Sequence, residues 1–110
     1  MWKSSLKFCT PIYKITSKFP EEEKFGLISQ LRRAAVSVPS NIAEGSAKSS
    51  NKHFVIFLEN ALGSCREIDT QMLVSLDLEF LKNEDFSILS NELNRIMVMI
   101  NNFIKKLGEN

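Results

Sequence analysis

The sequence predicts an all-α protein, an antiparallel up-down-up-down four-helix bundle that occupies residues 1–110 as a single domain. Apolar residues recur at steps of three and four in four successive segments, which is the spacing of one helix face. Only short breaks separate these segments, and helices of matched length, about 20 to 25 residues each, then pack antiparallel to their neighbours. A chain of 110 residues with 44% hydrophobic residues is also large enough to bury a core.

The first segment carries an apolar stripe with an internal proline. Phe8, Ile12, Ile15 and Phe19 recur at steps of four, three and four. Pro11 lies inside this stripe, and a proline removes a backbone N–H donor and crowds the preceding turn. We therefore expect the first helix either to be kinked at Pro11 or to begin near it.

The second segment is predicted to begin at Pro20 and to end at Gly45. Proline suits the first position of a helix, and the glutamates at 21–23 favour the positive end of the helix dipole. Pro39 should bend the last turns, and Gly45 should begin the loop that follows. The apolar stripe of this segment is Ile28, Leu31, Ala35, Val38 and Ile42.

The last two segments have clear ends and the most regular stripes. Ser49 or Ser50 can cap the third helix and Asn83 can cap the fourth, which Gly108 should terminate. The fourth stripe follows the a and d positions of a heptad. The third stripe is Phe54, Leu58, Ala61, Cys65, Ile68 and Met72, and the fourth is Leu89, Leu93, Ile96, Ile100, Phe103 and Leu107.

The residues needed for several kinds of chemistry are missing, so we expect no enzyme, no cofactor and no metal site. His53 is the single histidine, and Cys9 and Cys65 form no C-x-x-C pair, which predicts buried free thiols. The four glycines match no phosphate-binding loop. No run of about 18 apolar residues is present to span a membrane, and we expect a soluble, cytoplasmic protein.

Charge is distributed unevenly along the chain. Residues 1–53 contain nine Lys or Arg and four Glu, whereas residues 54–110 contain five Lys or Arg and nine Asp or Glu. The basic half can attract an anionic partner. Alternatively, the two halves neutralise one another within the bundle or between subunits.

Short polar side chains form a second stripe on each of the two middle helices. They can simply face water, but they differ from the mixture of Lys and Glu usual on solvated helices. Small and amide side chains suit a contact between subunits. The candidate interface residues are Gln30, Arg33, Ser37, Asn41 and Glu44 on the second helix, and Ser64 and Glu67 on the third.

Two blocks of sequence carry a family resemblance. The first is QLRRAAVSVPSNIAEG at 30–45, preceded by Phe19-Pro20 and Gly26-Leu27. The second comprises 57–58, 61–64 and 67–71. Together they resemble the signature of the four-helix bundle proteins encoded in intervening sequences of bacterial 23S ribosomal RNA genes, once labelled S23 ribosomal proteins.

The resemblance implies a bundle that assembles into a ring of five subunits, with no established enzymatic activity. The family is also similar to the accessory variability protein of diversity-generating retroelements, which binds nucleic acid through basic surfaces. Cys9 and Pro11 depart from the family pattern, in which the first helix continues regularly.

Our functional hypothesis is a homo-oligomer, a pentamer, whose basic side contacts RNA or a ribonucleoprotein. The alternative is a homo-oligomeric protein-interaction scaffold that binds no nucleic acid. Steep salt dependence of binding would distinguish the first from the second. The candidate nucleic-acid contacts are Lys3, Lys7, Lys14, Lys18, Arg32, Lys48 and Lys52.

Overall fold

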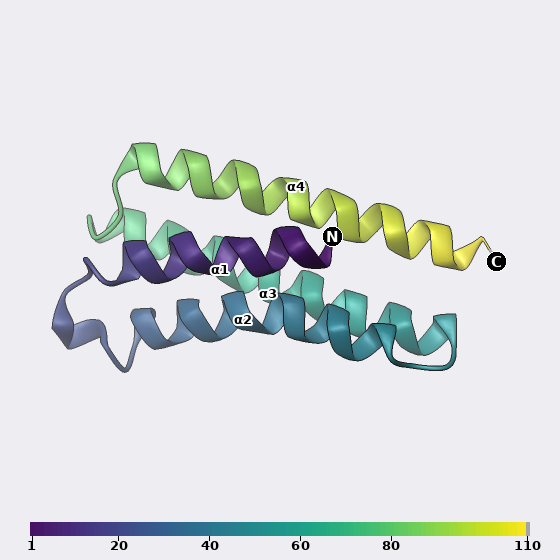
Figure 1. The fold of residues 1–110 in the computed structure, drawn as a ribbon. Coiled ribbons are helices and arrows are strands. Elements are labelled where there is room, and N and C mark those ends of the chain that lie inside the picture. Colours follow the sequence, from purple (N-terminus) through teal and green to yellow (C-terminus); the bar gives the residue numbers. More distant parts are fainter. Residues whose placement is uncertain (110) are drawn as a thin grey trace.

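The computed structural model describes residues 1–109, in which four α-helices and one short 3₁₀ helix follow one another without a strand. Figure 1 shows each α-helix running back along the one before it. Consecutive helices pack together, and the first also contacts the last. The predicted all-α class is confirmed. The elements are α1 (Trp2–Thr16), η1 (Glu21–Glu23), α2 (Leu27–Ser46), α3 (Asn51–Asp77) and α4 (Asn83–Gly108).

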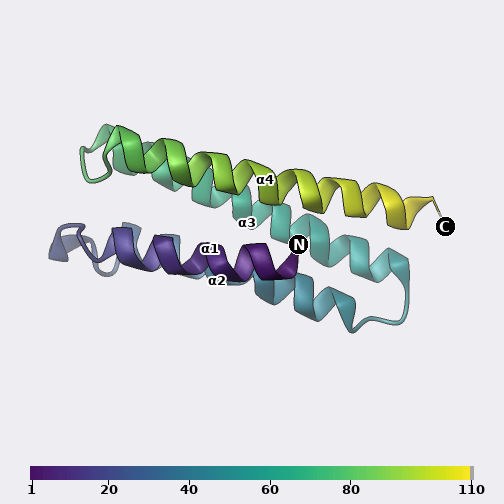
Figure 2. The same cartoon turned by 45° about the horizontal axis from the view of Figure 1, so that its top comes forward.

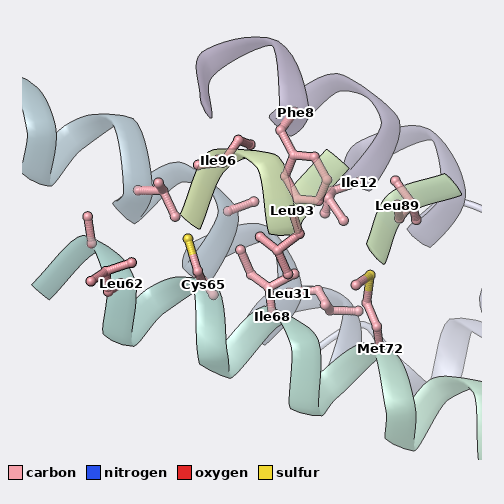
Figure 3. Packing of buried hydrophobic residues seen from close by; sticks show 14 of the residues in the cluster. Phe8, Ile12, Leu31, Leu62, Cys65, Ile68, Met72, Leu89, Leu93 and Ile96 are labelled. Carbon is pink, nitrogen blue, oxygen red and sulfur yellow. The ribbon is translucent and has the colours of Figure 1, made fainter. Parts of the chain in front are cut away.

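All four helices contribute to one hydrophobic core (Figure 3). The predicted stripes supply most of it, although Ile15 of the first stripe and Ile28 of the second are only partly buried. Phe54, Phe103 and Leu107, at the ends of the stripes of α3 and α4, are only partly buried. The fully buried positions include Ile12 on α1, Leu31 on α2, Leu58, Ile68 and Met72 on α3, and Leu93 and Ile100 on α4.

The helices were predicted to match in length, but the first is much shorter: α1 has 15 residues whereas α3 has 27. It begins at Trp2 and continues through Pro11, so it does not begin at the proline. It ends at Thr16, and Pro20 prevents a longer helix because it disfavours a helical conformation of Phe19. Figure 2 shows the consequence: the N-terminus lies partway along the bundle, and α2, α3 and α4 extend beyond it.

The predicted boundaries of the second helix are wrong at its start and slightly wrong at its end. The glutamates after Pro20 form η1, and α2 begins only at Leu27 because Gly26 has a non-helical backbone conformation. Pro39 lies within the helix and is buried. Gly45 does not begin a loop, because α2 continues to Ser46.

The last two helices begin differently. Ser50 caps α3 as predicted, since its hydroxyl accepts a hydrogen bond from the backbone N–H of His53 at 3.2 Å. Asn83 does not cap α4; it is the first helical residue, and Lys82 precedes it without a side-chain cap. In the turn between α3 and α4, Glu79 adopts a left-handed conformation with φ of 65°.

Gly45 and Gly63 provide a matched test of the packing between α2 and α3. A Cβ at Gly45 would lie 2.7 Å from the Cβ of Phe57, whereas a Cβ at Gly63 would meet nothing within 4 Å. We expect Gly45→Ala to lower the free energy of unfolding by about 1 to 3 kcal/mol through overpacking. Gly63→Ala should raise it by about 0.5 to 1 kcal/mol because alanine favours the helix. Urea denaturation measures both, and equal effects would contradict this packing.

Candidate nucleic-acid interface

Four lysines form one exposed stripe along α1 and the residues that follow it. Lys3, Lys7, Lys14 and Lys18 are separated by four, seven and four residues, so they lie on the same side of a helix with 3.6 residues per turn. All four are exposed, and α1 contains no acidic residue. Because about two turns separate Lys7 from Lys14, the stripe presents its charge over the whole length of α1.

This lysine stripe borders the contact between α1 and α4, where two shallow grooves lie. One groove of about 280 Å³ is lined by Ser4 and Lys7 from α1 and by Glu92, Arg95, Ile96 and Met99 from α4. The other, of about 180 Å³, contains Lys14 and Lys18 opposite Asp85. The two grooves contain four cations, which are the three lysines and Arg95, and two acids, Glu92 and Asp85. The surface therefore keeps an excess of positive charge.

Lys48 and Lys52 lie apart from the lysine stripe, at the end of the bundle where α2 turns into α3 (Figure 1). The Lys48 ammonium lies 5.1 Å from the centroid of the Phe57 ring, a cation–π contact. The side-chain amide of Asn51 donates to the Leu107 carbonyl at 3.5 Å, which joins the start of α3 to the end of α4. This end of the bundle therefore also carries Lys105 and Lys106.

Lys105 and Lys106 complete a cationic end, which we define as Lys48, Lys52, Lys105 and Lys106. Nothing in the sequence assigns the last two to a surface. No local signal could have done so, because more than 50 residues separate them from Lys52 and only the packing of α3 against α4 brings them together.

The opposite end of the bundle is acidic. There the ring of Phe19 packs against that of Phe80 with centroids 5.8 Å apart, which joins the segment around η1 to the turn between α3 and α4. Charge is thus separated between the two ends of a molecule 47 Å long, and not simply between the two halves of the sequence. The acids at this end are Glu21, Glu22, Glu23, Asp77, Glu79, Glu84 and Asp85, with Lys18, Lys24 and Lys82 among them.

Arg32 differs from the other predicted nucleic-acid contacts because its guanidinium is committed to α1. Its Nε donates to the Thr16 hydroxyl at 2.9 Å, and its Nη2 donates to the Tyr13 carbonyl at 3.1 Å. The guanidinium carbon also lies 4.5 Å from the centroid of the Tyr13 ring. We call this set of contacts the Arg32 clamp. Arg32 joins α2 to the end of α1, so we leave it out of the candidate nucleic-acid surface.

The predicted interface residues of α2 and α3 meet along a groove of about 440 Å³. The hydroxyls of Ser37 and Ser64 hydrogen-bond across it, and the Gln71 amide donates to the Gln30 carbonyl oxygen at 3.4 Å. The groove, which we call the α2–α3 groove, is lined by Gln30, Arg33, Ala34, Ser37, Ser64, Glu67 and Gln71. Asn41 and Glu44 lie farther along α2, outside this lining, and the Asn41 amide bonds to the Ser37 carbonyl at 2.8 Å.

One polar atom of the α2–α3 groove lacks a partner. The Oε1 atom of Gln71 is buried, and within residues 1–109 no group donates a hydrogen bond to it. Buried acceptors without a partner are uncommon, and each costs free energy. Helical spacing places Gln71 on the polar stripe of α3 together with Ser64 and Glu67, but its burial depends on how α2 packs, so it was not among the candidate interface residues.

Neither of the two thiols is activated. Burial raises the pKa of Cys65 to about 12 and also raises the pKa of Cys9, so both stay protonated at neutral pH. Both cysteines are free, and Cys9 is only partly buried.

His53 is exposed, with its Nδ1 atom 3.0 Å from the Ser50 hydroxyl. Within residues 1–109, no three side chains of the metal-binding types cluster, and no helix is long and apolar enough to cross a membrane.

The fold and this surface define a class: an all-α four-helix protein with a lysine-rich first helix and a polar groove between its second and third helices. The chain belongs to the 23S rRNA-intervening sequence protein family, whose model matches residues 1–102.

A solved structure supports the fold. The chain is similar to a crystal structure of a protein of unknown function from the S23 ribosomal protein family of Bacteroides thetaiotaomicron, with a TM-score of 0.85 and 24% sequence identity. The alignment covers 94% of this chain and 97% of that one. A comparison with curated proteins finds no match.

The Arg32 clamp yields a stability prediction. We expect Arg32→Ala to lower the free energy of unfolding by about 1 to 3 kcal/mol, because two hydrogen bonds from a charged group and a ring contact are lost together. Arg32→Lys should recover only part of this, since an ammonium does not reproduce the guanidinium geometry.

Arg66 is the matched control, being an exposed arginine on α3 outside the candidate surfaces. Arg66→Ala should change the free energy of unfolding by less than about 0.5 kcal/mol. Thermal or urea denaturation measures all three variants. A loss in Arg32→Ala no larger than that in Arg66→Ala would show that the clamp does not stabilise the bundle.

Proposed function

We propose that this protein is a non-enzymatic, cytoplasmic, homo-oligomeric bundle that binds RNA, alone or within a ribonucleoprotein. The observation that carries the proposal is the lysine stripe: four exposed lysines lie along one side of α1 and of the residues that follow it, and α1 contains no acidic residue. Lysines that neutralise phosphates supply sequence-independent affinity for nucleic acid. The name of the family refers to intervening sequences of 23S rRNA, so RNA is the first polyanion to test. Two free thiols are typical of a reducing compartment.

The cationic end is a second contact surface in this proposal. Lys48 and Lys52 lie beside the first turn of α3, where backbone N–H groups and serine hydroxyls can also receive phosphate. The acidic end of the bundle would repel the same polyanion. RNA should therefore contact the lysine stripe and the cationic end and avoid the acidic side chains of η1 and of the turn between α3 and α4, near which Lys14 and Lys18 lie.

The oligomer is proposed to assemble as a pentamer, as the family resemblance implies, with the α2–α3 groove as the contact between copies. The buried Gln71 Oε1 atom supports this, because a donor from a neighbouring copy would satisfy it. Arg33 and Glu67 border the same groove and are exposed, so they are accessible to a neighbour. A protein-interaction scaffold without RNA would use this groove and leave the lysine stripe unoccupied.

RNA binding is tested with matched lysine pairs. The double variant Lys7→Gln/Lys14→Gln should weaken RNA binding and reduce the slope of log K against log salt concentration by about 1.5 to 2, because two phosphate contacts are lost. Lys48→Gln/Lys52→Gln should weaken binding in the same direction. The control Lys24→Gln/Lys82→Gln removes two lysines from the acidic end and should have no effect.

Fluorescence anisotropy with labelled structured RNA measures these constants. Two results would contradict RNA binding: no complex with the unmodified protein at about 50 mM salt, where nonspecific electrostatic binding is strong, or equal weakening by the control pair. The scaffold would then be the better proposal.

Assembly is tested separately. Light scattering of the unmodified protein should give a mass several times that of the 12.5 kDa chain, about fivefold for a pentamer. Arg33→Ala and Gln71→Leu should weaken the oligomer while circular dichroism shows the same helical content, because both side chains border the groove and neither belongs to the core. A monomer of 12.5 kDa at micromolar concentration would contradict the oligomer.

A further inference from the structure

A second stripe runs along α1 beside the lysine stripe, and it is apolar. Trp2, Leu6 and Tyr13 each immediately precede a lysine, and they are separated by four and seven residues as the lysines are. One residue corresponds to a rotation of about 100° around an α-helix, so the two stripes run parallel along α1. The helix thus presents positive charge and exposed apolar surface side by side.

The apolar stripe is exposed and extends onto α2. The exposed fractions are 43% for Trp2, 47% for Leu6 and 43% for Tyr13. On α2, Val36 follows one helical turn after Arg32, which contacts Tyr13, so it lies on the side of α2 that faces α1, and it is 41% exposed. A run of four such side chains along one seam marks a contact surface, whereas single exposed apolar residues do not.

The adjacent lysines decide which kind of partner suits this surface. An apolar stripe alone would suit another protein, but here every turn that exposes an apolar residue also exposes a lysine, and α1 contains no acid. A partner that offers regularly spaced anions together with flat apolar groups is complementary to both stripes. A nucleic acid with unpaired bases has this chemistry, since phosphates meet the lysines and base faces meet the apolar side chains.

A single strand fits better than a duplex. In a duplex the base faces are stacked on one another and are unavailable to a side chain, whereas unpaired bases stack on aromatic rings. Arg32 already covers one face of the Tyr13 ring. The Trp2 indole makes no ring or cation contact within residues 1–109, so it is the ring available for stacking.

We infer that α1 binds single-stranded RNA, with phosphates along the lysine stripe and an unpaired base stacked on Trp2. The lysine stripe spans about 22 Å at 1.5 Å per residue, which is enough for a few nucleotides. This inference rests on the proposed RNA binding and narrows it to a class of RNA and to one stacking residue.

Trp2 is the single tryptophan of the chain, so its fluorescence reports directly on the proposed contact. An oligouridine of about 12 nucleotides, a length within the range of single-strand binding sites, is titrated into the full-length protein. A fully paired RNA duplex of the same length is the comparison. The single strand should quench the fluorescence and bind about tenfold tighter than the duplex, which should leave the fluorescence unchanged.

Substitutions test the stacking. Trp2→Ala should weaken single-strand binding about fivefold or more, the loss of one base–aromatic stack, and leave duplex binding unchanged. Trp2→Phe should restore most of the affinity because it keeps an aromatic face. The matched control is Phe25→Ala, which removes an aromatic ring that is 89% exposed at the acidic end, and it should not change the affinity.

The outcomes separate this inference from the proposed function. If both RNAs bind equally and neither quenches Trp2, the single-strand inference is wrong while RNA binding stands. If neither RNA binds, both are wrong. If Trp2→Ala dissociates the oligomer in light scattering, the apolar stripe is a contact between copies and the inference is overturned.

Discussion

The close approach of α2 to α3 is the constraint on which the rest of the molecule depends. At Gly45 the two helices leave no room for a Cβ, which would lie 2.7 Å from that of Phe57. Farther along, Ala34 occupies the same contact, and Ser37 and Ser64 hydrogen-bond across it. Because the side chains along this line are small, two polar stripes that are separate in the sequence become one groove. Gly45 also brings the start of α3 close to the end of α2, where the cationic end begins.

The way α1 is attached determines which of its faces is available. The Arg32 clamp holds the end of α1 against α2, and Cys9 bonds to the backbone of α2 farther along. The lysine stripe therefore lies on the side of α1 toward α4 and solvent, and the apolar stripe lies toward α2. Since α1 is short, it adds these two stripes to part of the bundle and leaves the other three helices to form the cationic end (Figure 2).

Because the two ends differ in charge, one end of the molecule attracts a polyanion and the other repels it. Lysines from two distant parts of the chain lie at the end where α2 joins α3. Seven acidic residues lie at the other end, which contains η1 and the turn between α3 and α4. Charges of opposite sign 47 Å apart are screened from one another at physiological salt, where the Debye length is about 8 Å. Each end therefore acts on a partner independently, which is why lysines at the acidic end serve as controls for those at the cationic end.

The sequence by itself determined the helical class, the central residues of the core, the Ser50 cap and the lysine stripe, because each depends on the spacing of residues within one segment. Tertiary structure decided what depends on residues far apart. The guanidinium of Arg32 has the charge and the donors of a phosphate contact, yet in the packed bundle it donates to Thr16 and Tyr13. Gln71 resembles any exposed amide until α2 buries one of its atoms. Periodicity reports the face on which a side chain lies, but only the packing of one helix on another decides what that side chain meets.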